Sequence, residues 1–155
     1  MTDGNGERIL IVDDEEHIRE VLERGLRRGG YECATAGSSD AAVEQLVDGD
    51  TFDLLLLDIR MPGKSGIDFL PEVKAQHPNM AVMMLTAVDE VSTAVRSMQD
   101  GAYDYVLKPV SMAELVVRVD QLSTLGAQFA FQALGPGTGQ GIRPVLGVAH
   151  QPPDG

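Results

Sequence analysis

The 155-residue sequence has no tryptophan and only one cysteine, Cys33, so the chain cannot form a disulfide bond within itself. Positive charge is also scarce, because 12 lysines and arginines face 24 aspartates and glutamates. Phosphate binding depends mainly on Lys and Arg, so we expect no direct binding of nucleic acid. No stretch reaches the roughly 20 apolar residues of a membrane span, and the polar start is unlike a signal peptide. These absences predict a soluble, cytoplasmic protein without membrane contact.

What the sequence does contain is an apolar pattern that alternates between two periods. Short apolar runs predict five strands, at 8–12, 31–36, 52–57, 80–85 and 103–107. Apolar residues at helical spacing follow each run and predict five helices. Their stripes are Ile18, Val21, Leu22 and Leu26; Val43, Leu46 and Val47; Ile67, Leu70 and Val73; Val91, Ala94, Val95 and Met98; and Leu115, Val119 and Leu122. Ser39 or Asp40 is expected to cap the second helix, and the fifth begins near Ser111.

This strict alternation predicts an α/β fold in which helices cover both faces of a parallel sheet. We expect a doubly wound, flavodoxin-like domain with strand order 2-1-3-4-5 over residues 8–124, and a disordered N-terminus over 1–7. Residues 125–155 are rich in glycine and proline, which predicts a flexible tail without an effector domain. Its GPGTGQG segment lacks the preceding strand and following lysine of a phosphate-binding loop.

Polar residues follow four of the predicted strands. Asp13 and Asp14 follow the first, Asp58 the third, Thr86 the fourth and Lys108 the fifth. The carboxyl ends of parallel strands meet at one edge of such a sheet, where this fold binds its ligands. Three carboxylates there would raise one another's pKa unless a divalent cation such as Mg²⁺ and a lysine compensated. No cluster of His and Cys suggests zinc instead.

A purely structural explanation of these carboxylates is also available. Asp13 and Asp14 could cap the helix that follows them, Asp58 could do the same for its loop, and Lys108 could form a surface ion pair. Independent caps have no reason to gather at one edge beside a lysine, so the group as a whole favours a chemical site. A carboxylate beside Mg²⁺ can attack phosphorus and form an acyl phosphate, while the lysine neutralises charge on the transferring group.

Four motifs occur in order: VDD (12–14), LLLLDIRMPGKSG (54–66), LTA (85–87) and YDYVLKP (103–109). With them the chain resembles a receiver domain of bacterial two-component response regulators. The resemblance implies that Asp58 is the phosphoacceptor and that the donor is a sensor histidine kinase or a phosphotransfer protein. It implies a signalling switch rather than an enzyme, one that catalyses only its own phosphorylation and slow autodephosphorylation.

The resemblance also assigns roles to the residues around the acceptor. Asp14 would bind Mg²⁺ directly and Asp13 through water, together with Asp58 and the backbone carbonyl of Arg60. Thr86 and Lys108 would contact the phosphoryl group.

A switch follows from the same resemblance. Thr86 would move toward the phosphoryl group and Tyr105, the switch aromatic, would turn into the vacated space. The fourth helix, fifth strand and fifth helix would then change their preference for a downstream effector domain or protein, or for a second copy of the chain. The Lys108–Pro109 peptide would be cis.

Two positions are expected to set the lifetime of the phosphorylated state. In the family they lie two residues after the acceptor and two after the threonine, here Arg60 and Val88. Val88 cannot orient a water by hydrogen bonding and Arg60 could pair with phosphoryl oxygens, so we predict a long lifetime.

Two other functions remain open from the sequence. A phosphatase of the haloacid dehalogenase type would need D-x-D at the nucleophile, but Arg60 stands two places after Asp58. A module that binds partners regardless of phosphorylation would not need the reacting groups. The chain is either a stand-alone receiver or a fragment of a longer regulator, and the low charge of its tail favours the second.

Overall fold

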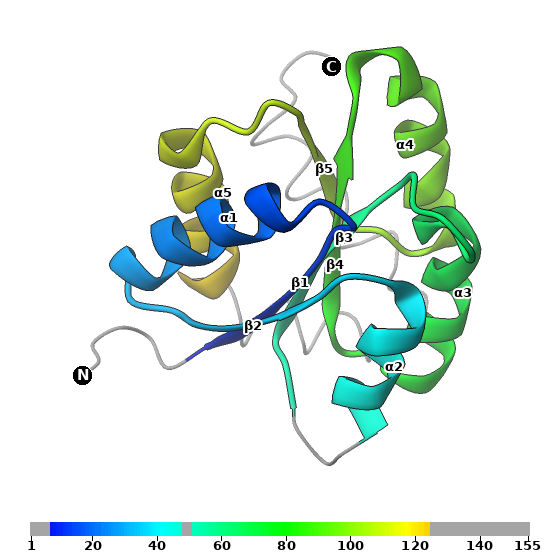
Figure 1. The fold of residues 1–155 in the computed structure, drawn as a ribbon, viewed down its shortest axis with the longest axis horizontal. Helices are drawn as coiled ribbons and strands as arrows, with labels where there is room; N and C mark the ends of the chain where they lie inside the picture. Colours follow the sequence, from blue (N-terminus) through cyan, green and yellow to red (C-terminus); the bar gives the residue numbers. More distant parts are fainter. Residues whose placement is uncertain (1–6, 48–50, 125–155) are drawn as a thin grey trace. The chain divides into compact units, whose positions relative to one another are not determined.

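The computed structural model describes residues 7–47 and 51–124 of the chain (Figure 1). Its strands are β1 (Arg8–Val12), β2 (Glu32–Ala36), β3 (Leu54–Asp58), β4 (Ala81–Thr86) and β5 (Asp104–Leu107). Its helices are α1 (Glu16–Arg28), α2 (Ser39–Val47), α3 (Gly66–Gln76), α4 (Val91–Ser97) and α5 (Met112–Thr124), with short 3-10 helices η1 (Val88–Glu90) and η2 (Met98–Asp100).

Among the described residues, those up to Arg118 belong to one compact unit and those from Val119 onward to a second. Of the second unit, only the end of α5 lies within the described residues. The predicted disorder of the N-terminus falls almost wholly outside the described residues, and the predicted flexible tail falls entirely outside them. The proposed domain limits of 8–124 therefore stay a prediction.

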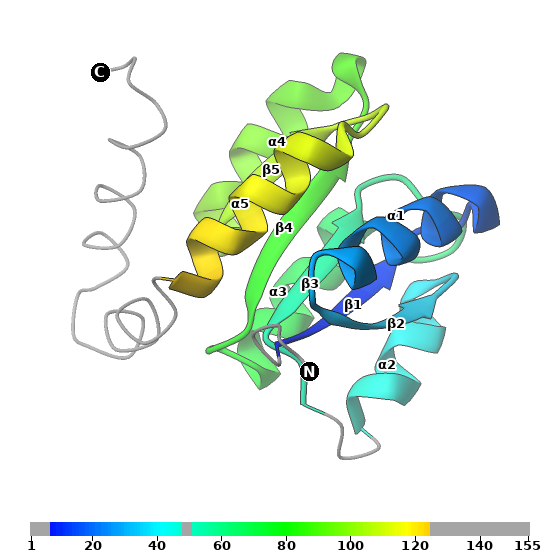
Figure 2. The ribbon, with the colours of Figure 1, turned by 90° about the vertical axis from the view of Figure 1, so that its left-hand side faces the viewer.

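The five strands form one sheet in the order β2-β1-β3-β4-β5, and every neighbouring pair is parallel. This confirms the predicted fold and strand order. Helices α2, α3 and α4 lie on one face, and α1 and the first turns of α5 lie on the other (Figures 1 and 2). Every residue of β3 and β4 is buried, as expected for central strands of a parallel sheet covered on both faces.

A glycine allows the close packing of the two helices on the second face. A Cβ atom at Gly25, near the end of α1, would lie 2.3 Å from the side-chain methyl of Met112 in α5 and would displace the end of that flexible side chain. Glycine inside a helix is normally unfavourable by about 1 kcal/mol relative to alanine, and here it leaves space for the neighbouring helix.

Several predicted details differ from the structure. Strand β3 starts at Leu54 rather than residue 52, and both β3 and β4 extend one residue further, so Asp58 and Thr86 are the last residues of their strands. The extension follows from the parallel register, which pairs Asp58 with Leu85 and Thr86 with Leu107.

The apolar stripes of two helices were also partly wrong. In α2, Val43 and Val47 are exposed, and the buried positions are Ser39, Ala42 and Leu46. In α4, Val95 is exposed, and the buried positions are Ala94 and Ser97. The small residues face the sheet in both helices, which leaves the valines on the outer side.

The predicted cap of α2 is wrong, whereas the predicted start of α5 near Ser111 is confirmed. Ser111 accepts a hydrogen bond from the Glu114 amide at the start of α5. In α2 the cap is Ser38, whose hydroxyl accepts a hydrogen bond from the Ala41 amide, while the Ser39 hydroxyl donates to the Lys64 carbonyl. Among the described residues, no helix has the length and apolar character needed to cross a membrane.

Candidate phosphoacceptor site

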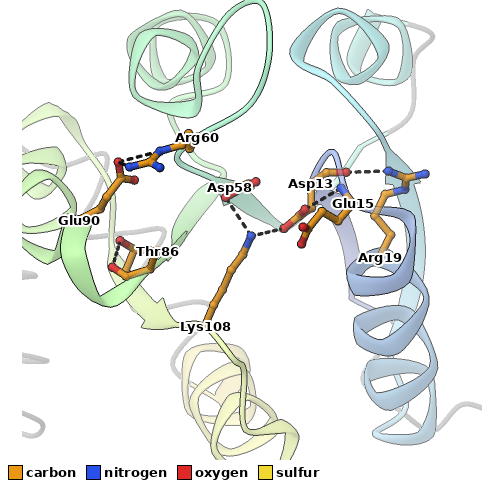
Figure 3. Close-up of polar contacts among 9 residues, drawn as sticks. Asp13, Glu15, Arg19, Asp58, Arg60, Thr86, Glu90 and Lys108 are labelled. Atoms are coloured by element: carbon orange, nitrogen blue, oxygen red, sulfur yellow. Dashed lines mark hydrogen bonds and ion pairs between the residues drawn. The ribbon is translucent and has the colours of Figure 1, made fainter.

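Lys108 lies between two aspartates at the carboxyl edge of the sheet (Figure 3). Its ammonium donates a hydrogen bond of 3.1 Å to Asp58 Oδ1 and lies 2.9 Å from Asp13 Oδ2. Asp13 directly follows β1, Asp58 ends β3 and Lys108 directly follows β5. The fold therefore brings together residues up to 95 positions apart, as the sequence predicts for the ends of parallel strands.

The aspartates of this edge differ in burial. Asp13 is 0% exposed and Asp58 4% exposed, while Asp14 is exposed to solvent. Each of the three offers a carboxylate oxygen, and these oxygens all lie within 4.8 Å of one another. The structure thus brings together the three predicted carboxylates, with two of them largely withdrawn from water.

Packing around β3 fixes the position of Asp58. The four leucines before it are buried and pair with β1 on one side and β4 on the other. The amide of Gly66, the first residue of α3, donates a hydrogen bond of 2.9 Å to the Ile59 carbonyl. A Cβ atom at Gly66 would lie 2.0 Å from the Asp58 carbonyl oxygen, so only glycine fits there. The start of α3 therefore packs directly on the backbone of Asp58.

The loop after β1 is held by hydrogen bonds to Asp13. Its Oδ1 atom accepts a bond of 2.9 Å from the Glu15 amide, and its backbone carbonyl accepts one of 2.7 Å from Arg19. This bond closes a turn before α1 and does not cap the helix, whose N-cap residue Glu15 has no side-chain cap hydrogen bond, so the capping explanation is wrong for Asp13. The other carboxylate oxygen of Asp13 faces Lys108. Arg19 was not predicted as a site residue, because its spacing in α1 is that of an ordinary polar face.

The charges of the site shift the pKa of both partners. Burial, and next the charge of Asp13, raise the pKa of Asp58 to about 7, although Lys108 acts in the opposite direction. Burial alone would lower the pKa of Lys108, but its contacts with Asp13 and Asp58 outweigh burial and raise it. The site therefore holds an excess of negative charge that one ammonium does not neutralise.

The arrangement fits a hard divalent cation. Asp13 Oδ2 is buried and accepts no hydrogen bond from the described residues, its one close cation being Lys108. Carboxylate oxygens are the ligands that Mg²⁺ prefers, and few of them are needed because this ion keeps several waters. Within the described ranges, no other group of three or more His, Cys, Asp and Glu side chains has this spacing.

The predicted switch residues lie on the two strands that follow β3 in the sheet. Thr86 is buried, and its hydroxyl donates a hydrogen bond of 3.0 Å to the Ala87 carbonyl. Tyr105, in β5, is half-buried and packs against the hydrophobic core. The Lys108–Pro109 peptide is cis, as the resemblance implied. The roles of Thr86 and Tyr105 stay predictions.

Arg60 makes a contact that the sequence did not predict. Its guanidinium donates from Nε, at 3.0 Å, and from Nη2 to one carboxylate oxygen of Glu90 in η1 (Figure 3). The predicted pairing of Arg60 with phosphoryl oxygens and the predicted metal contact of its carbonyl stay predictions. Glu90 gave no signal in the sequence, because it is one of many acidic residues outside the motifs.

Comparison with known proteins identifies the class that this fold and site define. The sequence model of the response regulator receiver domain matches residues 9–120. The chain belongs to this family, whose members are signalling modules of bacterial two-component systems. The comparisons support neither the phosphatase nor the phosphorylation-independent module.

Its relatives include longer transcriptional regulators. The chain is 42% identical over 111 residues to the DNA-binding transcriptional regulator NtrC of Klebsiella pneumoniae. It is 44% identical over 108 residues to the alginate biosynthesis transcriptional regulatory protein AlgB of Pseudomonas aeruginosa. These matches cover 72% and 70% of this chain but only 24% of each relative. The chain thus spans about a quarter of the length of these proteins.

Solved receiver domains share the fold. The receiver domain of NtrX from Brucella abortus is 34% identical, with a TM-score of 0.71 over 75% of this chain and 98% of that one. A CheY-like receiver domain protein from Methanospirillum hungatei is 28% identical, with a TM-score of 0.74 over 79% of this chain and 98% of that one.

Proposed function

We propose that Asp58 accepts a phosphoryl group from a sensor histidine kinase or a phosphotransfer protein, and that the modification alters a partner-binding surface. The observation that carries this proposal is the position of the Asp58 carboxylate. It is hydrogen-bonded to Lys108 and lies beside Asp13, in a cluster whose negative charge exceeds its positive charge. Such a site favours the binding of a cation, and a cluster of this kind favours a chemical role for Asp58 over a purely structural one.

The proposed reaction is a phosphoryl transfer to a carboxylate. An oxygen of ionised Asp58 forms a bond to phosphorus while the bond from phosphorus to the donor's leaving atom breaks, and the leaving group departs with the electron pair. The reaction needs the ionised carboxylate, whose pKa is raised to about 7 by burial and by Asp13 in the metal-free protein. Positive charge at the site lowers that pKa again and so favours the reactive form.

Asp13, Asp14 and Asp58 would hold Mg²⁺, with the carbonyl of Arg60 as a further oxygen ligand. When bound, the ion supplies positive charge to the phosphoryl oxygens. Lys108 supplies the second positive charge, because its ammonium already lies 3.1 Å from the Asp58 carboxylate. Transfer would thus need little rearrangement of the chain. Electrostatic stabilisation of a transition state requires hydrogen-bond donors that are already in position, as the Lys108 ammonium is.

The signal would leave the site through Thr86. Its hydroxyl now donates to the Ala87 carbonyl, and a phosphoryl group on Asp58 offers three strong acceptor oxygens instead. Movement of Thr86 toward them would open space for Tyr105, which is only half-buried. We infer that the surface of α4, β5 and α5 then changes its affinity for its partner.

The partner is proposed from the relatives. Two of them are named as transcriptional regulators, and this chain matches only about a quarter of each. We therefore propose that the receiver controls an effector domain or a separate effector protein, or assembles with a second copy of itself. Direct nucleic acid binding is not expected of a chain with a net charge of −12.

Intact mass spectrometry after incubation with acetyl phosphate tests the proposal. The wild-type chain should gain one phosphoryl group in Mg²⁺ and none in a chelator. The Asp58→Asn variant should gain none, because its amide is not a nucleophile. Asp40→Asn is the matched control, since Asp40 is an exposed aspartate of α2 that is not part of the acidic cluster. It should be modified like the wild type.

Other outcomes would contradict the proposal. An adduct that persists in Asp58→Asn would place the reaction at another residue. A wild-type chain that binds Mg²⁺ but forms no adduct would contradict the acceptor role itself and leave a module that binds partners without phosphorylation. Continuous release of phosphate from small phosphomonoesters would instead favour a phosphatase.

A further inference from the structure

The ion pair between Arg60 and Glu90 connects two loops beside the acceptor. Arg60 lies two residues after Asp58, in the loop between β3 and α3, and Glu90 ends η1, between β4 and α4. Both Nε and Nη2 of Arg60 donate to the same oxygen of Glu90. The Arg60 side chain is 70% exposed and that of Glu90 only 18%, so Glu90 is the more firmly placed partner.

The ion pair directs the guanidinium of Arg60 to Glu90, although the charges of Arg60 and Asp58 also attract each other. Figure 3 shows Arg60 directed at Glu90, with Lys108 as the cation that contacts Asp58. The pKa of Arg60 is raised first by its hydrogen bond to Glu90 and by the charge of Glu90, and further by Asp89 and Asp58. Arg60 is therefore a second cation close to the acceptor. In the unphosphorylated structure its guanidinium is paired with Glu90.

We propose that Glu90 is a positioning residue that competes with the incoming phosphoryl group for the guanidinium of Arg60. This inference rests on the proposed phosphorylation of Asp58. A phosphoryl donor carries about two negative charges against the single charge of Glu90, and its oxygens accept two hydrogen bonds from a guanidinium. Arg60 exchanges partners when the donor arrives, and η1 loses its connection to the loop that follows the acceptor.

The exchange is feasible because the guanidinium of Arg60, the partner that moves, is largely exposed to water. Ion pairs in contact with water are individually weak, so an anion of higher charge can displace Glu90 without a large barrier. The pair also bears on how the acidic edge would receive an anionic donor. Arg60 neutralises part of that charge, and Glu90 determines how much of the arginine's charge is available to the donor.

The rate of phosphorylation by acetyl phosphate tests this assignment. In saturating Mg²⁺ and low salt, Glu90→Gln frees Arg60 and should raise the second-order rate constant about threefold. The increase should disappear at high ionic strength, because salt screens exposed charges. Asp89→Asn is the matched control, since it removes the same charge from the adjacent residue, which accepts no hydrogen bond from Arg60. Its rate should change much less.

A double-mutant cycle separates the pair from the general charge effect. If Glu90 acts through Arg60, then Glu90→Gln in the Arg60→Gln background should have no more effect than Asp89→Asn. An equal increase from Glu90→Gln in both backgrounds would overturn the inference. So would identical rates for Glu90→Gln and Asp89→Asn in the otherwise wild-type chain.

A second measurement reports the pair without any reaction. The Nε–H signal of Arg60 in proton–nitrogen NMR spectra should be protected from exchange in the wild type and lose that protection in Glu90→Gln. If the wild type forms no aspartyl phosphate, the proposed function fails, whatever this signal does. If the adduct forms but the two variants behave alike, only the role of Glu90 is refuted.

Discussion

The two edges of the sheet differ in how their charged side chains are paired and solvated. At the amino edge, Arg8 donates its amide to Asp53 and a guanidinium nitrogen to the Thr51 carbonyl, and its guanidinium lies 4.5 Å from the ring centre of Phe52. Glu32 completes this group at 3.5 Å, with its side chain 70% exposed. At the carboxyl edge, three carboxylates form a cluster in which one ammonium contacts only Asp13 and Asp58, the two that are buried.

The comparison shows that unfavourable electrostatic energy is concentrated at the carboxyl edge of the sheet. Charges at the amino edge are solvated or paired locally, so they act only on the local structure. Charges at the carboxyl edge are buried in excess, which costs stability unless a cation or a covalent change relieves it. A receiver needs that imbalance, because a site already neutral would have no reason to bind a cation.

Removing the Lys108 ammonium should have the largest effect on stability, and a much larger one than removing Arg8 at the other edge. Lys108→Met leaves Asp13 and Asp58 without their ammonium and should lower the free energy of unfolding by about 3 kcal/mol in metal-free buffer at pH 8. Arg8→Met at the amino edge should cost only about 1 kcal/mol, because its partners remain solvated. Urea denaturation of both variants measures the difference, and equal losses would contradict it.

Mg²⁺ should restore the balance at the carboxyl edge. At about 100 times its dissociation constant, the ion should stabilise the wild type by about 2.7 kcal/mol, as for any ligand that binds only the folded state. The gain should be lost in Asp13→Asn and kept in Asp53→Asn, which changes the amino edge. Thermal unfolding with and without the ion measures this, and a similar gain in both variants would place the ion elsewhere.

The pH dependence of stability should reveal the excess charge without any metal. The pKa of Asp58 is raised from 3.8 to about 7, so the folded state holds a proton that the unfolded state has lost. Stability from this group is therefore present at low pH and declines as pH rises from about 4 to 7. Asp58→Asn removes that decline and should be more stable than the wild type by about 1 kcal/mol at pH 8.

Urea unfolding in a chelator at pH 5 and pH 8 checks the sign. The advantage of Asp58→Asn should be larger at pH 8 than at pH 5. A variant that is less stable than the wild type at pH 8 would mean that the acceptor carboxylate is not under repulsion.

The smallest expected effect concerns the lifetime of the phosphorylated state. Val88 is 71% exposed at the start of η1, so a polar side chain fits there without loss of packing. Val88→Asn should accelerate loss of phosphate about threefold, because an amide can orient an attacking water. Decay of the adduct by intact mass measures it, with Val47→Asn, an exposed valine of α2, as the control. No change or slower decay would contradict the prediction.

The sequence alone determined the fold and the main residues of the site. Alternating strand and helix patterns leave a parallel sheet as the consistent arrangement, and its strand ends must share one edge. Asp13, Asp58 and Lys108 could therefore be placed together without coordinates. Motif resemblance added the cis peptide after Lys108, which the structure contains.

The contacts between loops could not be predicted from the sequence and became known only from the three-dimensional arrangement of the elements. Whether Arg60 points to Glu90, and whether Arg19 holds the Asp13 carbonyl, depends on side chains that meet across different elements. The exposure of Val43 was also decided by packing, because the buried face of α2 carries Ser39, Ala42 and Leu46 instead. Periodicity fixes which residues share a face, whereas the neighbouring elements determine which face is buried and which cation each carboxylate receives.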